Sequence, residues 1–118
     1  MTEYEVYDDA RRIQFAGVLL ASVTSATPQK QRWLELSLYR TAAGAYVLAG
    51  VGRSEVAGEV DRKWAQVSLE PEGIVDRLTM FDEDTGAEYV PKTSRQLLEK
   101  ASDIDGKVAR AWRTHHVA

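Results

Sequence analysis

Cysteine is absent from this 118-residue chain, and proline and histidine are scarce, with three and two residues. Without cysteine the protein cannot form disulfides, thiolate zinc sites, iron–sulfur centres or a cysteine nucleophile, which fits a reducing compartment. No apolar run approaches the roughly 20 residues that a membrane-spanning helix needs. The acidic start, Met1–Glu5, lacks the basic-then-apolar order of a signal peptide. These absences predict a cytoplasmic globular protein.

Neither sign of charge dominates, because fifteen Lys and Arg stand against eighteen Asp and Glu, for a net charge of −3. This balance argues against a nucleic-acid coat protein and against a highly acidic tail protein. The charge is unevenly distributed. Residues 70–88 hold seven acids and one base, whereas residues 30–63 and 92–113 are net basic. The length and the 44% of apolar residues predict a single globular domain over residues 1–118.

Residues 1–69 are predicted to be mainly β-structure. The clearest pattern lies in residues 32–53, where Leu34, Leu36 and Leu38 alternate with polar and aromatic residues. The turn Thr41–Gly44 suits a three-residue hairpin loop with a glycine bulge, which places Leu38 opposite Leu48. Residues 63–69 are expected to form a further strand, with part of a helix as the alternative.

Residues 70–92 are expected to form a short helix opened by Pro71, an acidic turn, and a short strand around Tyr89. Residues 93–114 are predicted to be a helix capped by Thr93, and residues 115–118 a mobile tail. One apolar stripe runs along the predicted helix, made of Leu97, Ala101, Ile104, Val108 and Trp112. A glycine at position 106 weakens this helix and could divide it in two.

The expected fold class is α+β: a twisted antiparallel sheet of four to six strands with the C-terminal amphipathic helix packed on one face. The leucine face is the predicted core, and Gly50 and Gly52 would leave space there for the helix. The opposite face carries Trp33, Tyr39 and Val51 and is more apolar than a freely solvated sheet face. Because the chain's own helix can shield only one face, the second face is predicted to be a docking surface.

Tryptophan, tyrosine and arginine together are typical of buried interface centres, which favours protein binding without catalysis. The partner would be another protein or a second copy in a homodimer. The predicted binding residues are Trp33, Tyr39, Val47, Val51, Arg40 and Arg53. A secondary electrostatic contact is predicted at an acidic patch of Glu70, Glu72, Asp76, Asp82, Glu83 and Asp84. An alternative function is single-stranded nucleic-acid binding, since several basic residues surround aromatic residues that could stack on nucleobases. The basic residues are Lys30, Arg32, Arg40, Arg53, Arg62 and Lys63, and the aromatic residues are Trp33, Tyr39 and Trp64.

No catalytic, metal or cofactor site is predicted. Gly50–Ser54 lacks the third glycine of a dinucleotide fingerprint and the Walker pattern. The carboxylates of Asp82–Glu88 resemble calcium-loop spacing, but glycine stands where a ligand belongs and the bidentate glutamate is missing. His115 and His116 have neither cysteine nor further histidine to complete a zinc site.

The hairpin Leu36–Val47 resembles a segment of the EXLDI-type accessory proteins of bacterial plasmids, phages and integrative elements. The shared feature is a tyrosine-arginine-threonine turn followed by an aromatic strand. The resemblance covers about a dozen of the 118 residues, and the family's namesake C-terminal run is matched only by an Asp-Ile pair at Asp103 and Ile104. It implies a small accessory protein of a mobile element, a setting in which inhibitors of host defence are common.

Overall fold

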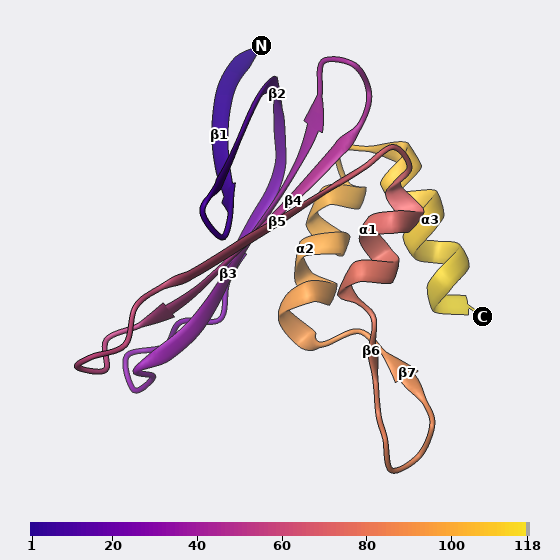
Figure 1. Cartoon of the computed structure of the whole chain (residues 1–118). Coiled ribbons are helices and arrows are strands. Elements are labelled where there is room, and N and C mark those ends of the chain that lie inside the picture. Colours follow the sequence, from indigo (N-terminus) through magenta and orange to yellow (C-terminus); the bar gives the residue numbers. More distant parts are fainter. Residues whose placement is uncertain (118) are drawn as a thin grey trace.

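The computed structural model describes the backbone of residues 1–117 and the side chains of residues 1–115. Five strands form one antiparallel sheet in chain order (Figure 1). Two helices pack against one of its faces, and a third helix packs on those two. The strands are β1 (Thr2–Asp8), β2 (Arg11–Thr24), β3 (Arg32–Thr41), β4 (Tyr46–Ser54) and β5 (Arg62–Ser68). The helices are α1 (Pro71–Leu78), α2 (Lys92–Ser102) and α3 (Gly106–Val117). This architecture confirms the predicted α+β class, with three helices in place of two.

The hairpin of β3 and β4 has the predicted register. Leu38 pairs with Leu48, and the pairing continues from Arg40 and Tyr46 to Arg32 and Ser54. Gly44 adopts a φ of 88°, in the left-handed region that a glycine bulge requires. The predicted strand at 63–69 is also confirmed as β5.

The sheet curls because β2 bends halfway along its length. Residues 11–17 of β2 pair with β1, whereas residues 17–24 pair with β3, and the register shifts by one residue at Leu20. An extra residue of this kind is a β-bulge, which increases local twist and turns the strand. The curl brings the β1–β2 turn against β5, where the Asp9 amide donates to the Lys63 carbonyl. The face away from the helices is therefore concave.

The main core lies between the helices and the leucine face of the sheet. Leu36, Leu38 and Leu48 are almost fully buried there. Helices α2 and α3 contribute Leu97, Leu98, Ala101, Val108 and Trp112 to the same cluster. Ile104, which the apolar stripe placed in the core, is 61% exposed. The helix ends before Ile104, so the residue leaves the helical periodicity that would have turned it inward.

The predicted helix over 93–114 is in fact two helices, and their junction precedes Gly106. Helix α2 begins after Pro91 without a side-chain cap, so Thr93 is not the N-cap. Asp105 ends the break between the helices and accepts hydrogen bonds from the amides of Lys107 and Val108. Helix α3 then runs through Val117, which corrects the prediction of a tail beginning at residue 115. The last position of that predicted tail, residue 118, lies outside the described residues.

Gly50 makes room for a tryptophan and not for a helix. A Cβ atom on Gly50 would overlap the indole of Trp64, which lies across it from β5. The other side of the indole faces Arg77 of α1, whose guanidinium carbon lies 4.3 Å from the ring centroid. Gly52, two residues further along β4, has its nearest neighbour atoms at 3.8 Å or more. The space predicted for a helix at Gly50 is therefore filled by a side chain of the neighbouring strand.

A short hairpin of β6 (Met80–Phe81) and β7 (Glu88–Tyr89) projects from the lower end of the helix layer (Figure 1). Its turn contains Asp82, whose side chain accepts hydrogen bonds from the amides of Asp84 and Thr85. This matches the predicted acidic turn before a short strand. Over residues 1–117, no helix combines the length and the apolar character needed to cross a bilayer.

Candidate binding cleft on the concave face

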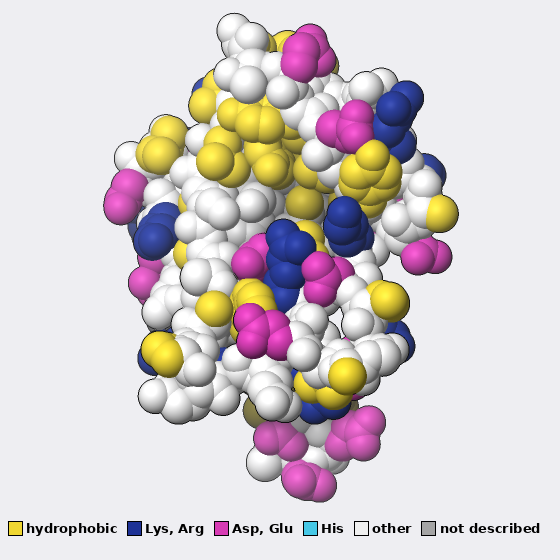
Figure 2. Space-filling view, turned by 90° about the vertical axis from the view of Figure 1, so that its left-hand side faces the viewer, with side chains coloured by type: hydrophobic (Ala, Val, Ile, Leu, Met, Phe, Trp, Pro, Cys, Tyr) yellow, Lys and Arg dark blue, Asp and Glu magenta, His cyan; other side chains and the backbone are white. Residues whose placement is uncertain are grey.

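The concave face holds a half-open cavity of about 790 Å³, which we call the cleft. Side chains from β1, β3, β4 and β5 line it, and on the β2 side it reaches Gln96 and Lys100 of α2. Figure 2 views the molecule from the side away from the helices, with an apolar area above a group of basic and acidic side chains. Of the predicted binding residues, Tyr39, Val51 and Arg53 line the cleft. Trp33 and Arg53 line an adjoining cavity of about 660 Å³.

One end of the cleft is bordered by an aromatic cluster. The ring of Tyr39 lies 4.7 Å from that of Tyr4 and 5.2 Å from that of Phe15, centroid to centroid. Val6 and Val47 are buried outside the helix-side core, and Val47 is only 1% exposed. The prediction that this whole sheet face lacks cover from its own chain is therefore wrong, because the curl of the sheet brings β1 over part of it. Val47 cannot belong to a docking surface.

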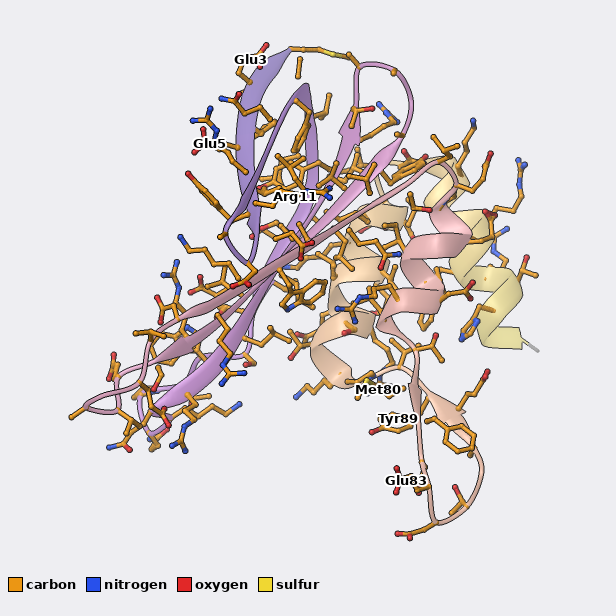
Figure 3. The ribbon with its side chains drawn as sticks, in the orientation of Figure 1. Glu3, Glu5, Arg11, Met80, Glu83 and Tyr89 are labelled. Atoms are coloured by element: carbon orange, nitrogen blue, oxygen red, sulfur yellow. The ribbon has the colours of Figure 1, made fainter. Side chains whose placement is uncertain are left out.

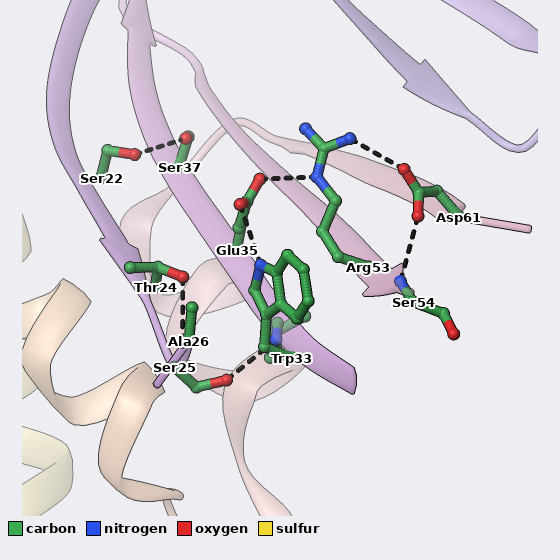
Figure 4. A network of polar contacts seen from close by, with 11 residues as sticks. Ser22, Thr24, Ser25, Ala26, Trp33, Glu35, Ser37, Arg53, Ser54 and Asp61 are labelled. Atoms are coloured by element: carbon green, nitrogen blue, oxygen red, sulfur yellow. Dashed lines mark hydrogen bonds and ion pairs between the residues drawn. The ribbon is translucent and has the colours of Figure 1, made fainter. Parts of the chain in front are cut away.

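The other end of the cleft is polar and held by ion pairs (Figure 4). The Arg53 guanidinium donates to Glu35 at 2.9 Å and to Asp61 at 2.8 Å. The Trp33 indole N–H donates to the other oxygen of Glu35 at 3.1 Å. The hydrogen bond from Trp33, followed by that from Arg53, lowers the pKa of Glu35. Glu35 is thus held as a carboxylate and is poorly suited to act as a general acid.

The β2 side of the cleft is an open sheet edge. Residues 18–24 pair with β3 on one side only, since β1 ends its pairing at Gly17. The Ser25 amide donates to the Leu34 carbonyl of β3, so by strand alternation the amides of Ser22 and Thr24 point away from β3. The Ser22 hydroxyl lies 3.0 Å from that of Ser37 on the cleft floor. An extended chain could therefore pair with this edge beside the cavity.

The basic residues of the predicted surface are mostly engaged in ion pairs. Arg32 pairs with Glu59, and Arg53 pairs with Glu35 and Asp61. Arg40 lies on the opposite, helix-facing side of the sheet, where it pairs with Asp105 at 2.8 Å. Arg40 is therefore a link between sheet and helices and does not line the concave face.

Two lysines at the cleft keep their charge available. Lys63 and Lys100 line the cavity, and neither forms a salt bridge with the described residues. The Lys63 ammonium lies 5.1 Å from the centroid of the Tyr7 ring. The carboxylate of Glu5, by contrast, is paired with Arg12 at 3.8 Å and accepts hydrogen bonds from Tyr7 and Gln14. The free charge at the cleft is therefore positive.

The predicted acidic patch does not form one surface. Glu70, Glu72 and Asp76 lie at the start and along the length of α1, whereas Asp82, Glu83 and Asp84 lie at the tip of the projecting hairpin beyond it. Figures 1 and 3 show the hairpin extending away from the end of α1. The two acidic groups would meet different surfaces of a partner.

Sequence reasoning missed Tyr4, Phe15 and Asp61 as neighbours of the predicted site, and it missed the open edge of β2. One signal was present in the chain. A fourteen-residue β2 beside a seven-residue β1 leaves half of the longer strand unpaired on that side. The packing of Tyr4 and Phe15 on Tyr39 depends on the curl of the sheet and has no local signal.

His115 lies in α3 rather than in a tail. Its Nε2 lies 3.3 Å from the Thr79 hydroxyl, and its ring stacks on that of Trp112. Within residues 1–115, no three His, Cys, Asp or Glu side chains come together as a metal-ligand set.

No protein-family model, curated protein or solved structure matches this chain.

Proposed function

We propose that this protein is a non-catalytic binding module that takes an extended segment of a protein partner into the cleft. The open edge of β2 at residues 18–24, beside a cavity of about 790 Å³, is the observation that carries this proposal. An extended peptide that pairs with an exposed sheet edge gains main-chain hydrogen bonds, and its alternate side chains enter the adjoining pockets.

The lining of the cleft favours a segment that is both apolar and acidic. The aromatic cluster around Tyr39 offers apolar contact at one end. Lys63 and Lys100 offer positive charge that no carboxylate among the described residues neutralises by a salt bridge. Glu35 and Arg53 satisfy each other and would contribute shape and polarity more than net charge.

Binding without catalysis is supported by the state of the polar groups at the cleft. Glu35 is held as a carboxylate, and its pKa is lowered. The two hydroxyls on the floor, Ser22 and Ser37, face each other, and no histidine is among the described residues that line the cleft. A nucleophile needs an adjacent base to be activated, and His115, the histidine whose side chain is described, lies in the helix layer.

Single-stranded nucleic-acid binding has less support. It needs several free cations beside exposed aromatic rings. Of the six basic residues expected to supply them, Arg32, Arg40 and Arg53 are paired with carboxylates. A cytoplasmic location and an accessory or inhibitory role in a mobile element remain part of our proposal. The mobile-element role rests on the hairpin resemblance alone.

Selection of a random peptide library displayed on phage would test the proposal. Peptides enriched on the wild-type protein should be extended, apolar and acidic. Their binding should shift the backbone amide resonances of residues 18–24 and Lys63. Ser22→Pro removes an outward amide and blocks the edge, so it should weaken binding by at least about tenfold.

Glu3→Pro is the matched control, because it places proline on the outer edge of β1, away from the residues that line the cleft. It should bind the peptides as the wild type does. The proposal is wrong if the library yields no binder, if binders perturb another surface, or if Ser22→Pro binds them at full strength.

A further inference from the structure

The β6–β7 hairpin exposes apolar side chains in a way that its own fold does not explain. Met80, Phe81 and Tyr89 are 50%, 62% and 48% exposed. Figure 3 shows the labelled Met80, Glu83 and Tyr89 on a finger that stands clear of the body. A two-stranded hairpin is marginally stable alone in water, and clustered exposed apolar side chains mark interaction sites.

The hairpin has the chemistry that the cleft requires. It carries four carboxylates, at Asp82, Glu83, Asp84 and Glu88, and both strands are extended with one edge unpaired. The free charge of the cleft is positive, at Lys63 and Lys100. The exposed rings of Phe81 and Tyr89 could pack against the aromatic cluster around Tyr39.

We infer that the hairpin of a second copy of this chain occupies the cleft, with one of its strands paired to the open edge of β2. This inference rests on the proposed function and names its partner. Hairpin and cleft are different surfaces of the molecule, so the contact is heterologous. Two copies could exchange hairpins in a closed pair, or successive copies could form a longer array.

Sedimentation velocity over a range of protein concentrations tests this inference with two variants. Phe81→Asp disables the hairpin at an exposed position, and Ser22→Pro disables the cleft. The wild type should self-associate, and each variant alone should lose association by at least about tenfold. Glu72→Lys changes an acid on α1 outside the hairpin and should associate as the wild type does.

Mixing the two variants is the decisive measurement. In the mixture, the Ser22→Pro copy has an intact hairpin and the Phe81→Asp copy has an intact cleft. A one-to-one complex should therefore form although each variant alone is monomeric. Circular dichroism melts of both variants would show that they are folded.

A wild type that stays monomeric at every concentration, or a mixture that forms no complex, overturns the inference. Failure of the proposed function can be told apart from failure of this inference. If the monomeric wild type still binds library peptides at the edge of β2, the cleft has another protein as its occupant. If it binds none, the proposed function itself is wrong.

Discussion

The Asp105 carboxylate, in the turn before α3, lies 2.8 Å from the guanidinium of Arg40 on β3 and ties the helix layer to the sheet. Asp105 is 2% exposed. It also accepts a hydrogen bond from the Tyr46 hydroxyl and two from the first turn of α3. Burial, followed by the hydrogen bond to Asp105, raises the pKa of Tyr46 to about 12, so Tyr46 remains a donor.

Asp105→Ala should lower the free energy of unfolding by about 2–4 kcal/mol, because it removes a helix cap and leaves Arg40 and Tyr46 without their acceptor. Urea denaturation followed by circular dichroism would measure the change. Asp103→Ala, at an exposed position two residues earlier, should alter stability by less than about 0.5 kcal/mol. Equal effects of the two substitutions would contradict a structural role for the buried carboxylate.

The stability that Asp105 contributes should depend on pH. Burial alone would raise the pKa of Asp105, but hydrogen bonds from the Val108 amide, Tyr46 and Arg40 outweigh burial and lower the pKa below 3.8. The carboxylate therefore binds protons less readily when the protein is folded. Its contribution is fully present above the unfolded pKa and is lost as the pH falls through the folded value.

Thermal melts of the wild type and of Asp105→Asn should accordingly differ most at neutral pH. The difference between their melting temperatures should narrow as the pH falls below about 4, since the carboxylate becomes protonated there. A difference that stays constant down to pH 2 would show that the ionised carboxylate is not the source of the stability.

Gly50→Ala should destabilise the fold by about 1–3 kcal/mol, because the added methyl group would overlap the Trp64 indole and overpack the core. Gly52→Ala is the matched control, on the same strand and the same face, where an added methyl group would have its nearest neighbours at an ordinary contact distance of 3.8 Å. It should be close to neutral. Chemical denaturation of both variants would test the difference.

A second substitution separates the steric effect from any change in strand propensity. Trp64→Leu removes the indole, so Gly50→Ala should cost less in that background than in the wild type. An unchanged cost in a double-mutant cycle would mean that Trp64 is not the obstacle.

Tyr39→Ala should lower the free energy of unfolding by about 1–3 kcal/mol, because its ring packs on Tyr4 and Phe15. Tyr39→Phe keeps the ring and should change stability by less than about 0.5 kcal/mol. Differential scanning calorimetry can compare the two. If Tyr39→Ala left the free energy of unfolding unchanged, the Tyr39 ring would not be packed against its own chain.

The strands that carry the candidate site could be predicted from the sequence. The segments that pack over those strands could not. The alternation in β3 and the turn at 41–44 are local, and they place Tyr39 and Arg53 on the concave side. Arg40 was wrongly grouped with Tyr39, since strand alternation places Arg40 on the same face as Leu36 and Leu38. Its partner, Asp105, is sixty-five residues away.

The amino-acid sequence by itself determined the register of the central hairpin, the helix that opens at Pro71 and the acidic turn, since each depends on residues close together in the chain. The tertiary structure alone decided that Trp64 fills the space over Gly50, and that β1 curls across the second apolar face. Those features depend on contacts between distant segments, where buried volume and paired charge outweigh local preference.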